Sequence, residues 1–162
     1  MKFQEGKIDG VECRNLTQYK DHRGWLTEVF RQDELNGYDP ALCYISLTLP
    51  GVTRGPHEHK EQTDWFVFTG PGEFEIHLWD NRENSATYGH CQTLVAGDDC
   101  PMRVIVPPGV VHGYKNVSDV PGLVVNCPDR LFAGWNRSEP VDEIRHEDDE
   151  NTSFLIASPK MR

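Results

Sequence analysis

The sequence lacks the features that mark membrane-spanning, secreted and nucleic-acid-binding proteins. No stretch of the 162 residues approaches the roughly 18 consecutive apolar residues that a membrane-spanning helix needs. The first ten residues contain no apolar segment of the kind found in a signal peptide. Lys and Arg number 16 against 26 Asp and Glu, which gives a formal net charge of −10. Because this charge repels nucleic acids and anionic membrane surfaces, we expect neither as a partner.

Cysteine is scarce and irregularly placed. The five cysteines are an odd number without a C-x-x-C pair, at Cys13, Cys43, Cys91, Cys100 and Cys127. Disulfide frameworks and structural zinc sites need cysteines in pairs at short spacings. The sequence therefore predicts neither, and a reducing cytoplasm is the expected location.

Patterns for long helices and internal repeats are also missing. Instead, 14 Gly and 11 Pro separate short apolar or alternating segments. These segments predict strands at 25–30, 43–49, 65–68, 73–79, 93–95, 103–106 and 122–127. Asp80 and Arg82, after the fourth of them, are interpreted as a turn with a surface ion pair. Short strands joined by turns are typical of an all-β barrel or jelly roll.

The chain length fits one domain spanning residues 1–162. Residues 139–162 form a polar, acidic C-terminal segment, which we expect to be solvated. Within 43–49 the alternation is clear, with Ile45, Leu47 and Leu49 on one face and Ser46 and Thr48 on the other. We expect the apolar face to pack in the core and the polar face to line a cavity.

Two histidine-containing segments dominate the middle of the sequence. His57 and His59 are one residue apart, so in an extended strand their side chains point to the same face. His112 follows Pro107, Pro108 and Gly109, a turn that ends one strand and directs the next. If that next strand pairs with the first, three imidazoles meet in one pocket.

This spacing resembles the two signature motifs of the cupin superfamily. The first motif is matched by Gly51, His57, His59, Asp64 and Gly70, and the second by Pro107, Gly109, His112 and Asn116. The resemblance implies the cupin double-stranded β-helix, a jelly-roll barrel with few short helices.

Longer blocks in the same order are similar to the dTDP-4-dehydrorhamnose 3,5-epimerase family. They are Asp21-x-Arg23-Gly24 with Glu28, Ser46-x-Thr48-x-x-Gly51-x-x-Arg54-Gly55-x-His57, Asp80-x-Arg82-x-x-Ser85-x-Thr87-x-Gly89, and Pro107-x-Gly109-x-x-His112-Gly113. The resemblance implies a metal-free, cofactor-free homodimeric isomerase acting on a nucleotide-linked sugar, here a dTDP-4-keto-6-deoxyhexose. A base removes the proton α to the C4 ketone, an enolate forms, and a proton returns to the other face. A dimer is expected also because the edges of an open barrel need cover.

The matching positions receive the following expected roles. His57 is the general base, because a neutral imidazole suits proton abstraction near neutral pH. His112 polarises the carbonyl or orients the sugar. Arg23 and Arg54 hold the diphosphate, for which a guanidinium fork is well suited. Further substrate contacts are expected from Glu28, Ser46, Thr48 and His59.

Departures from the family pattern leave other interpretations open. Asp64 falls where the family has a lysine that stabilises the enolate oxygen, and Val125 falls near the family's catalytic tyrosine. His59 replaces a glutamine and Ile76 an acidic residue. The chain then inverts only one carbon, or it has lost epimerase chemistry.

Two alternatives follow from the second possibility. In the first, His57, His59, His112 and Asp64 or Glu61 bind a divalent transition metal that acts as a Lewis acid or binds oxygen. In the second, the chain binds a sugar nucleotide without turnover.

Overall fold

The computed structural model describes residues 2–35 and 37–156, whose regular structure is dominated by β-strands. One sheet has six strands in the order β1-β9-β8-β11-β6-β13. These strands are β1 Gln4–Glu5, β6 Thr53–Glu58, β8 Glu73–Asp80, β9 His90–Gly97, β11 Val110–Asn116 and β13 Ile144–Arg145. A second sheet has five strands in the order β2-β10-β7-β12-β5. They are β2 Glu12–Asn15, β5 Tyr44–Thr48, β7 Asp64–Phe68, β10 Met102–Val106 and β12 Gly122–Asn126.

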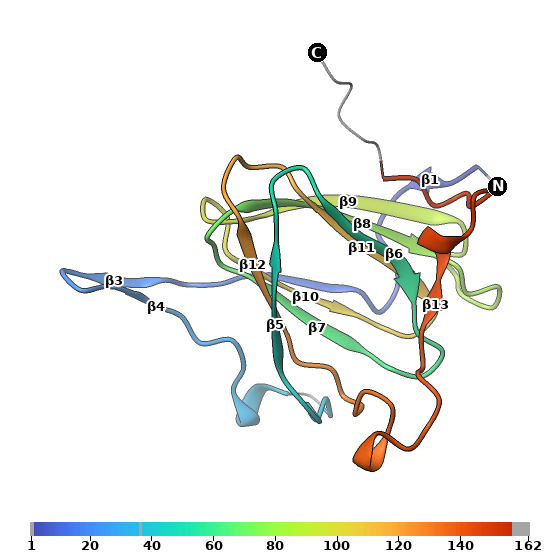
Figure 1. Ribbon diagram of the computed structural model, residues 1–162, viewed down its shortest axis with the longest axis horizontal. Coiled ribbons are helices and arrows are strands. Elements are labelled where there is room, and N and C mark those ends of the chain that lie inside the picture. Colours follow the sequence, from blue (N-terminus) through green and yellow to red (C-terminus); the bar gives the residue numbers. More distant parts are fainter. Residues whose placement is uncertain (1, 36, 157–162) are drawn as a thin grey trace.

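The two sheets lie face to face and enclose the core (Figure 1). Phe68 of β7, Phe74 and Leu78 of β8 and Val104 of β10 are fully buried in it. All five residues of β7 are buried, as expected for its almost continuously apolar sequence. The all-β architecture predicted from the sequence is therefore confirmed.

The helices of the described chain are short 3-10 segments, namely η1 Gln32–Glu34, η2 Trp135–Arg137 and η3 His146–Asp148. None of the helices in residues 2–35 and 37–156 has the length and apolar character needed to cross a membrane.

A small hairpin protrudes from the barrel. It is formed by β3 Tyr19–Asp21 and β4 Gly24–Leu26, which pair only with each other (Figure 1). The strand predicted over residues 25–30 is thus shorter than expected and begins one residue earlier. The prediction was wrong because the alternation of residues 27–30 is not matched by a neighbouring strand that could pair with them.

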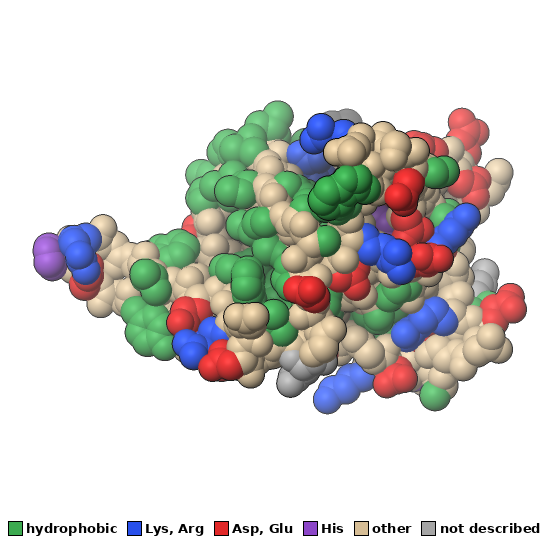
Figure 2. Space-filling model, turned by 90° about the horizontal axis from the view of Figure 1, so that it is seen from below, with side chains coloured by type: hydrophobic (Ala, Val, Ile, Leu, Met, Phe, Trp, Pro, Cys, Tyr) green, Lys and Arg blue, Asp and Glu red, His purple; other side chains and the backbone are tan. Residues whose placement is uncertain are grey.

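Strand β5 shows its apolar face to solvent, whereas we expected that face to pack in the core. Ile45 is 66% exposed and Leu47 52%, whereas Thr48 is 1% exposed. The polar face points into the barrel, where Ser46 contacts the Tyr114 hydroxyl at 3.0 Å. Hydrophobic side chains gather on the surface between the protruding hairpin and the body of the barrel (Figure 2). The expectation that the polar face of β5 points inward is confirmed, and the expectation that its apolar face packs in the core is wrong.

The acidic C-terminal segment folds back along the barrel up to residue 156, and most of residues 139–151 are exposed, as expected of a solvated surface segment. Strand β13 pairs with β6, with Arg145 opposite His57 (Figure 1). The ring of Phe154 is buried against Phe3 and Trp79, with ring centroids 5.3 and 5.7 Å away. Phe154 and the free edge of β6 anchor the segment, which its acidic composition does not reveal. The rest of the segment, 157–162, lies outside the described residues.

Candidate active site

A cavity of about 1110 Å³ opens between the two sheets at the end covered by the C-terminal segment. Strands β5, β6 and β11 supply Ser46, Arg54, His57 and Tyr114 to its wall. Residues 139–143, Arg145 and Glu147 of the C-terminal segment close another side. The cavity combines an apolar wall with polar groups from several elements, as small-molecule sites do.

The pairing of β6 with β11 brings the three motif histidines together. His112 lies directly opposite His57 in the antiparallel ladder, and a register irregularity follows between His112 and Tyr114. The ring centroid of His57 is 4.5 Å from that of His112 and 5.6 Å from that of His59. One shared site is what the spacing of these residues predicts.

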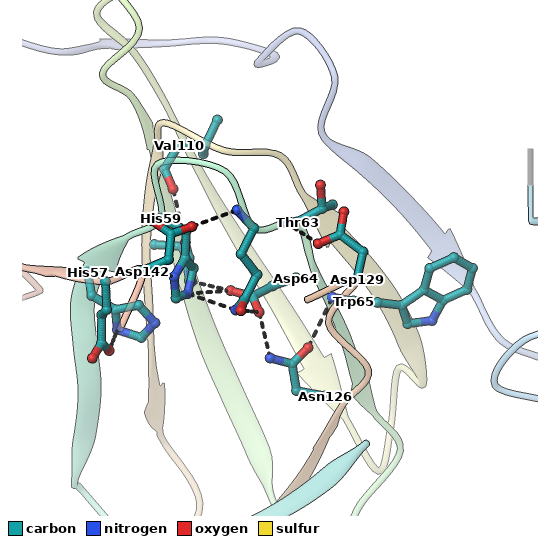
Figure 3. Close-up of polar contacts among 12 residues, drawn as sticks. His57, His59, Thr63, Asp64, Trp65, Val110, Asn126, Asp129 and Asp142 are labelled. Carbon is teal, nitrogen blue, oxygen red and sulfur yellow. Dashed lines mark hydrogen bonds and ion pairs between the residues drawn. The ribbon is translucent and has the colours of Figure 1, made fainter. Parts of the chain in front are cut away.

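Asp64, at the start of β7, completes the cluster from the opposite sheet. Its Oδ2 lies 3.1 Å from Nε2 of His59 and 3.1 Å from Nε2 of His112 (Figure 3). Its Oδ1 accepts hydrogen bonds from the side-chain amides of Gln62 at 2.9 Å and Asn126 at 2.8 Å. Burial opposes the charge of this carboxylate, but the neighbouring His112 and His59 outweigh burial and lower the pKa of Asp64.

His59 is fixed on its other side by the C-terminal segment. Its Nδ1 donates to the backbone carbonyl of Asp142 (Figure 3). The Asp142 carboxylate in turn accepts three hydrogen bonds of 2.9 Å from the backbone N–H groups of Lys60, Glu61 and Gln62. Burial alone would disfavour a charged His59, but Asp64 and then Asp142 raise its pKa to about 9.

His57 faces a carboxylate that sequence reasoning missed. Its Nδ1 lies 3.9 Å from Oε1 of Glu143, and its side chain is 17% exposed. Burial, followed by the charge of His112, lowers the pKa of His57 to about 2, so this imidazole is neutral. Nothing in the acidic run distinguishes Glu143 from its exposed neighbours. Only the pairing of β13 with β6 places it beside His57.

The predicted substrate contacts on β5 and β6 also gather here. Arg54 lines the cavity, and its guanidinium donates to Thr48 Oγ1 at 2.9 Å and to the Leu47 carbonyl at 2.7 Å. Ser46 lines the same cavity. Thr48 is buried behind Arg54 and orients the guanidinium, so within this chain it supports the arginine and is not part of the described wall.

Arg23 and Glu28 are not part of this site within one chain. The Arg23 side chain is 79% exposed in the turn between β3 and β4 and pairs with Asp21 at 2.6 Å. Glu28 pairs with Arg31 at 3.2 Å. Neither residue is among the described residues that line the cavity.

Two tyrosines stand in the cavity wall, although the family's tyrosine position near Val125 holds none. The Tyr114 hydroxyl is engaged with Ser46. The Tyr44 oxygen accepts a hydrogen bond of 3.0 Å from Asn126 Nδ2, which leaves its own proton available. Burial raises the pKa of Tyr44 to about 12, so the hydroxyl keeps that proton at neutral pH. The alternation of 43–49 could have identified Tyr44, because it shares the polar face of β5 with Ser46 and Thr48.

The facing sheets and the histidine-lined cavity between them define a cupin barrel with groups suited to acid–base chemistry. Comparison with known proteins identifies the family. A family model described as dTDP-4-dehydrorhamnose 3,5-epimerase matches residues 5–144. The chain belongs to this family of isomerases.

Relatives agree with this assignment. The chain is 39% identical over 127 residues to "Probable low-salt glycan biosynthesis epimerase Agl13" of Haloferax volcanii, which covers 77% of this chain and 81% of that protein. It is 33% identical over 150 residues to the spore coat polysaccharide biosynthesis protein SpsL of Bacillus subtilis, covering 91% and 95% of the two chains. The crystal structure of a dTDP sugar isomerase from Desulfovibrio desulfuricans has a TM-score of 0.79 at 23% identity, covering 96% of this chain and 94% of that one. The predicted cupin-type epimerase fold is confirmed.

Proposed function

We propose that this chain is a sugar-nucleotide epimerase that acts on a dTDP-linked 4-keto-6-deoxyhexose. It removes a proton from a carbon next to the C4 ketone and returns a proton to the opposite face of the sugar. The observation that carries the proposal is the placement of His57 in the cavity wall, with Glu143 beside its Nδ1. A base within reach of a substrate and a carboxylate behind it is the arrangement that proton abstraction needs.

Glu143 acts through His57. When His57 takes up a proton, the imidazolium forms next to a carboxylate 3.9 Å away, and the opposite charge stabilises it. Glu143 is therefore a positioning residue for the base. The remaining motif histidine, His112, lies next to His57 in the ladder, but it is buried and is not among the described residues that line the cavity.

Tyr44 is the proposed proton donor. Its phenol lines the cavity and belongs to the five-stranded sheet, whereas His57 belongs to the six-stranded sheet. An acid and a base on two facing walls can serve the two faces of one sugar carbon. The absence of a tyrosine near Val125 is thus compensated by a residue on the neighbouring strand, because β5 pairs with β12.

The nucleotide part of the substrate needs positive charge, and Arg54 supplies it inside the cavity. We propose that the chain is a homodimer and that Arg23 serves a cavity other than its own. The hairpin extends away from the barrel (Figure 1) and carries exposed Tyr19, Trp25 and Leu26, and the apolar face of β5 is exposed as well. A second copy would cover this apolar surface, and a protruding hairpin could then reach its partner.

Solvent exchange tests the proposed reaction. The protein is incubated in deuterated water with dTDP-4-keto-6-deoxyglucose, and NMR follows deuterium uptake at C3 and C5. We expect exchange at one or both carbons with the wild type and none above background with His57→Ala. His90→Gln, at a histidine outside the described cavity wall, serves as the matched control and should keep full exchange.

Each other outcome has a definite meaning. Full exchange by His57→Ala would remove His57 as the base. Binding of the sugar nucleotide without exchange by the wild type would overturn the epimerase proposal in favour of a binding module.

A further inference from the structure

The buried cluster of His59, Asp64 and His112 contains polar atoms that the described protein does not satisfy. Asp64 Oδ2 and His112 Nε2 are buried and have no hydrogen-bond partner among the described residues. The side chains of Asp64 and His112 are 1% and 3% exposed, so bulk water does not supply a partner. Unsatisfied buried polar groups are costly, and their presence in pairs indicates a missing ligand.

In both His59 and His112, Nδ1 is used for a hydrogen bond to a backbone carbonyl, whereas Nε2 faces Asp64. Nδ1 of His112 faces the carbonyl of Val110 at 2.9 Å, and Nδ1 of His59 faces the carbonyl of Asp142 (Figure 3). Because a carbonyl oxygen only accepts, each Nδ1 carries the proton. Nε2 of both rings lies 3.1 Å from Asp64 Oδ2, and Nε2 of His59 also lies 3.2 Å from the side-chain amide of Gln62.

Two imidazole nitrogens and one carboxylate oxygen, all atoms that can ligate a metal, therefore converge on one point. A single proton satisfies only one of the two contacts. Two protons would create two adjacent imidazolium ions, with ring centroids 5.9 Å apart, against one carboxylate. One divalent cation satisfies all three atoms at once.

The distances fit a metal ion. Two ligand atoms each about 2.1 Å from an ion and about 95° apart lie about 3.1 Å from each other. Nε2 of His59 and Nε2 of His112 are both 3.1 Å from Asp64 Oδ2. Together with His57, the ligand atoms of the group lie within 4.8 Å of one another.

We propose that His59, Asp64 and His112 form a binding site for one divalent transition-metal ion. Two imidazoles and a carboxylate suit Fe²⁺, Co²⁺, Ni²⁺, Zn²⁺ or Mn²⁺, and His59 among them lines the cavity. The surrounding groups match those that orient metal ligands. Backbone carbonyls hold both imidazoles, and Gln62 and Asn126 hold the Oδ1 of the carboxylate.

His57 is assigned to proton transfer and not to the ion, because Glu143 is its neighbouring carboxylate. The binding of a metal ion does not depend on the proposed epimerase activity, but the role of the ion in the reaction rests on that proposal. In that reaction an ion at this site supplies the positive charge that a developing enolate oxygen needs, which Asp64 alone would oppose.

A titration of the full-length protein with Co²⁺ tests the site. Protein stripped with a chelator is titrated while the visible absorption of bound Co²⁺ and the melting temperature are recorded. We expect one equivalent per chain and a rise in melting temperature for the wild type. Asp64→Asn and His112→Gln should each weaken binding on the order of 100-fold or more, and the milder Gln62→Ala by about 10-fold.

Matched controls exclude trivial causes. His90→Gln removes a histidine elsewhere, Glu150→Gln removes one charge of the acidic segment, and both should bind Co²⁺ as the wild type does. His57→Ala should also bind Co²⁺ with unchanged affinity. Far-UV circular dichroism of each metal-free variant establishes whether it is folded. If Asp64→Asn or His112→Gln does not fold, Co²⁺ binding by Gln62→Ala still tests the site.

The outcomes separate the two proposals. Deuterium exchange by protein that binds no Co²⁺, Zn²⁺, Fe²⁺, Ni²⁺ or Mn²⁺ stoichiometrically overturns the metal site and leaves the epimerase intact. Stoichiometric metal without exchange supports the site and overturns the epimerase. Loss of Co²⁺ binding by His57→Ala equal to that of His112→Gln would overturn the assignment of His57 as a free base.

Discussion

We predict that the carboxylate of Asp80 makes a large contribution to the free energy of unfolding of the barrel that holds the site. It is fully buried at the end of β8 and lies opposite Val110, whose carbonyl holds His112. Oδ1 accepts from Arg82 Nε at 2.8 Å, and Oδ2 accepts from the Ser85 and Thr87 hydroxyls at 2.6 Å each. The interpretation of Asp80 and Arg82 as a surface ion pair is therefore wrong for Asp80. A turn that surrounds a buried carboxylate has the same sequence pattern as a turn with a surface ion pair.

In Asp80→Asn, one carboxylate oxygen becomes an NH2 group. This donor then faces the N–H or O–H donors that the carboxylate oxygen accepted from. Breaking a buried, hydrogen-bonded ion pair by changing one partner costs about 3 to 5 kcal/mol of unfolding free energy. We expect a loss at the lower end of that range, because the side chain of Arg82 is still 26% exposed and water can replace part of its interaction.

The effect should depend on pH with a defined sign. Burial opposes the charge, but hydrogen bonds from Arg82, Ser85 and Thr87 outweigh it and lower the pKa of Asp80. A lowered folded-state pKa gives stability that is complete above the unfolded pKa of about 3.9 and is lost as the pH falls below it. The difference between wild type and Asp80→Asn should thus be constant from about pH 5 to 8 and shrink toward pH 3.

Urea unfolding followed by tryptophan fluorescence, at about pH 7 and pH 3.5, measures both effects. The exposed Asp119→Asn is the matched control and should change stability by less than about 0.5 kcal/mol. A loss below about 1 kcal/mol for Asp80→Asn at pH 7, or a difference that grows as the pH falls, would refute the reasoning.

Three further predictions concern binding, proton return and assembly. Arg54→Ala should weaken dTDP binding about 10- to 100-fold, the worth of charge-assisted hydrogen bonds, with little change in melting temperature; equal loss of both would make Arg54 structural. Tyr44→Phe should slow inversion on the order of 100-fold while deuterium exchange persists by NMR, and loss of both would contradict its role as donor. Ile45→Asp should convert a dimer to a monomer in sedimentation, whereas Val95→Asp, on the exposed face of β9, should not.

The histidine site could be predicted because local spacing constrains it. His57 and His59 share a face by strand geometry alone, and the turn before His112 limits where the next strand can run. The exposure of the apolar face of β5 could not be predicted in the same way. Alternation gives two faces, and only the rest of the barrel decides that Ser46 and Thr48 point inward while Ile45 is left outside. Where a surface is covered by a second copy, an apolar face outside the barrel carries the same pattern as a core face.

The contribution of the C-terminal segment is non-local, which is why the acidic composition hid it. Neighbouring residues of an extended chain point in opposite directions, so consecutive positions can reach two different partners. Asp142 holds His59 through its carbonyl, while the next residue, Glu143, places its carboxylate beside His57. The segment makes a third contact with the barrel through His146, whose Nε2 lies 2.9 Å from Oε1 of the buried Glu58. One short segment therefore holds His59 by a hydrogen bond and places a carboxylate beside His57, and the proposed acid–base and cation-binding properties of the site depend on its return to β6.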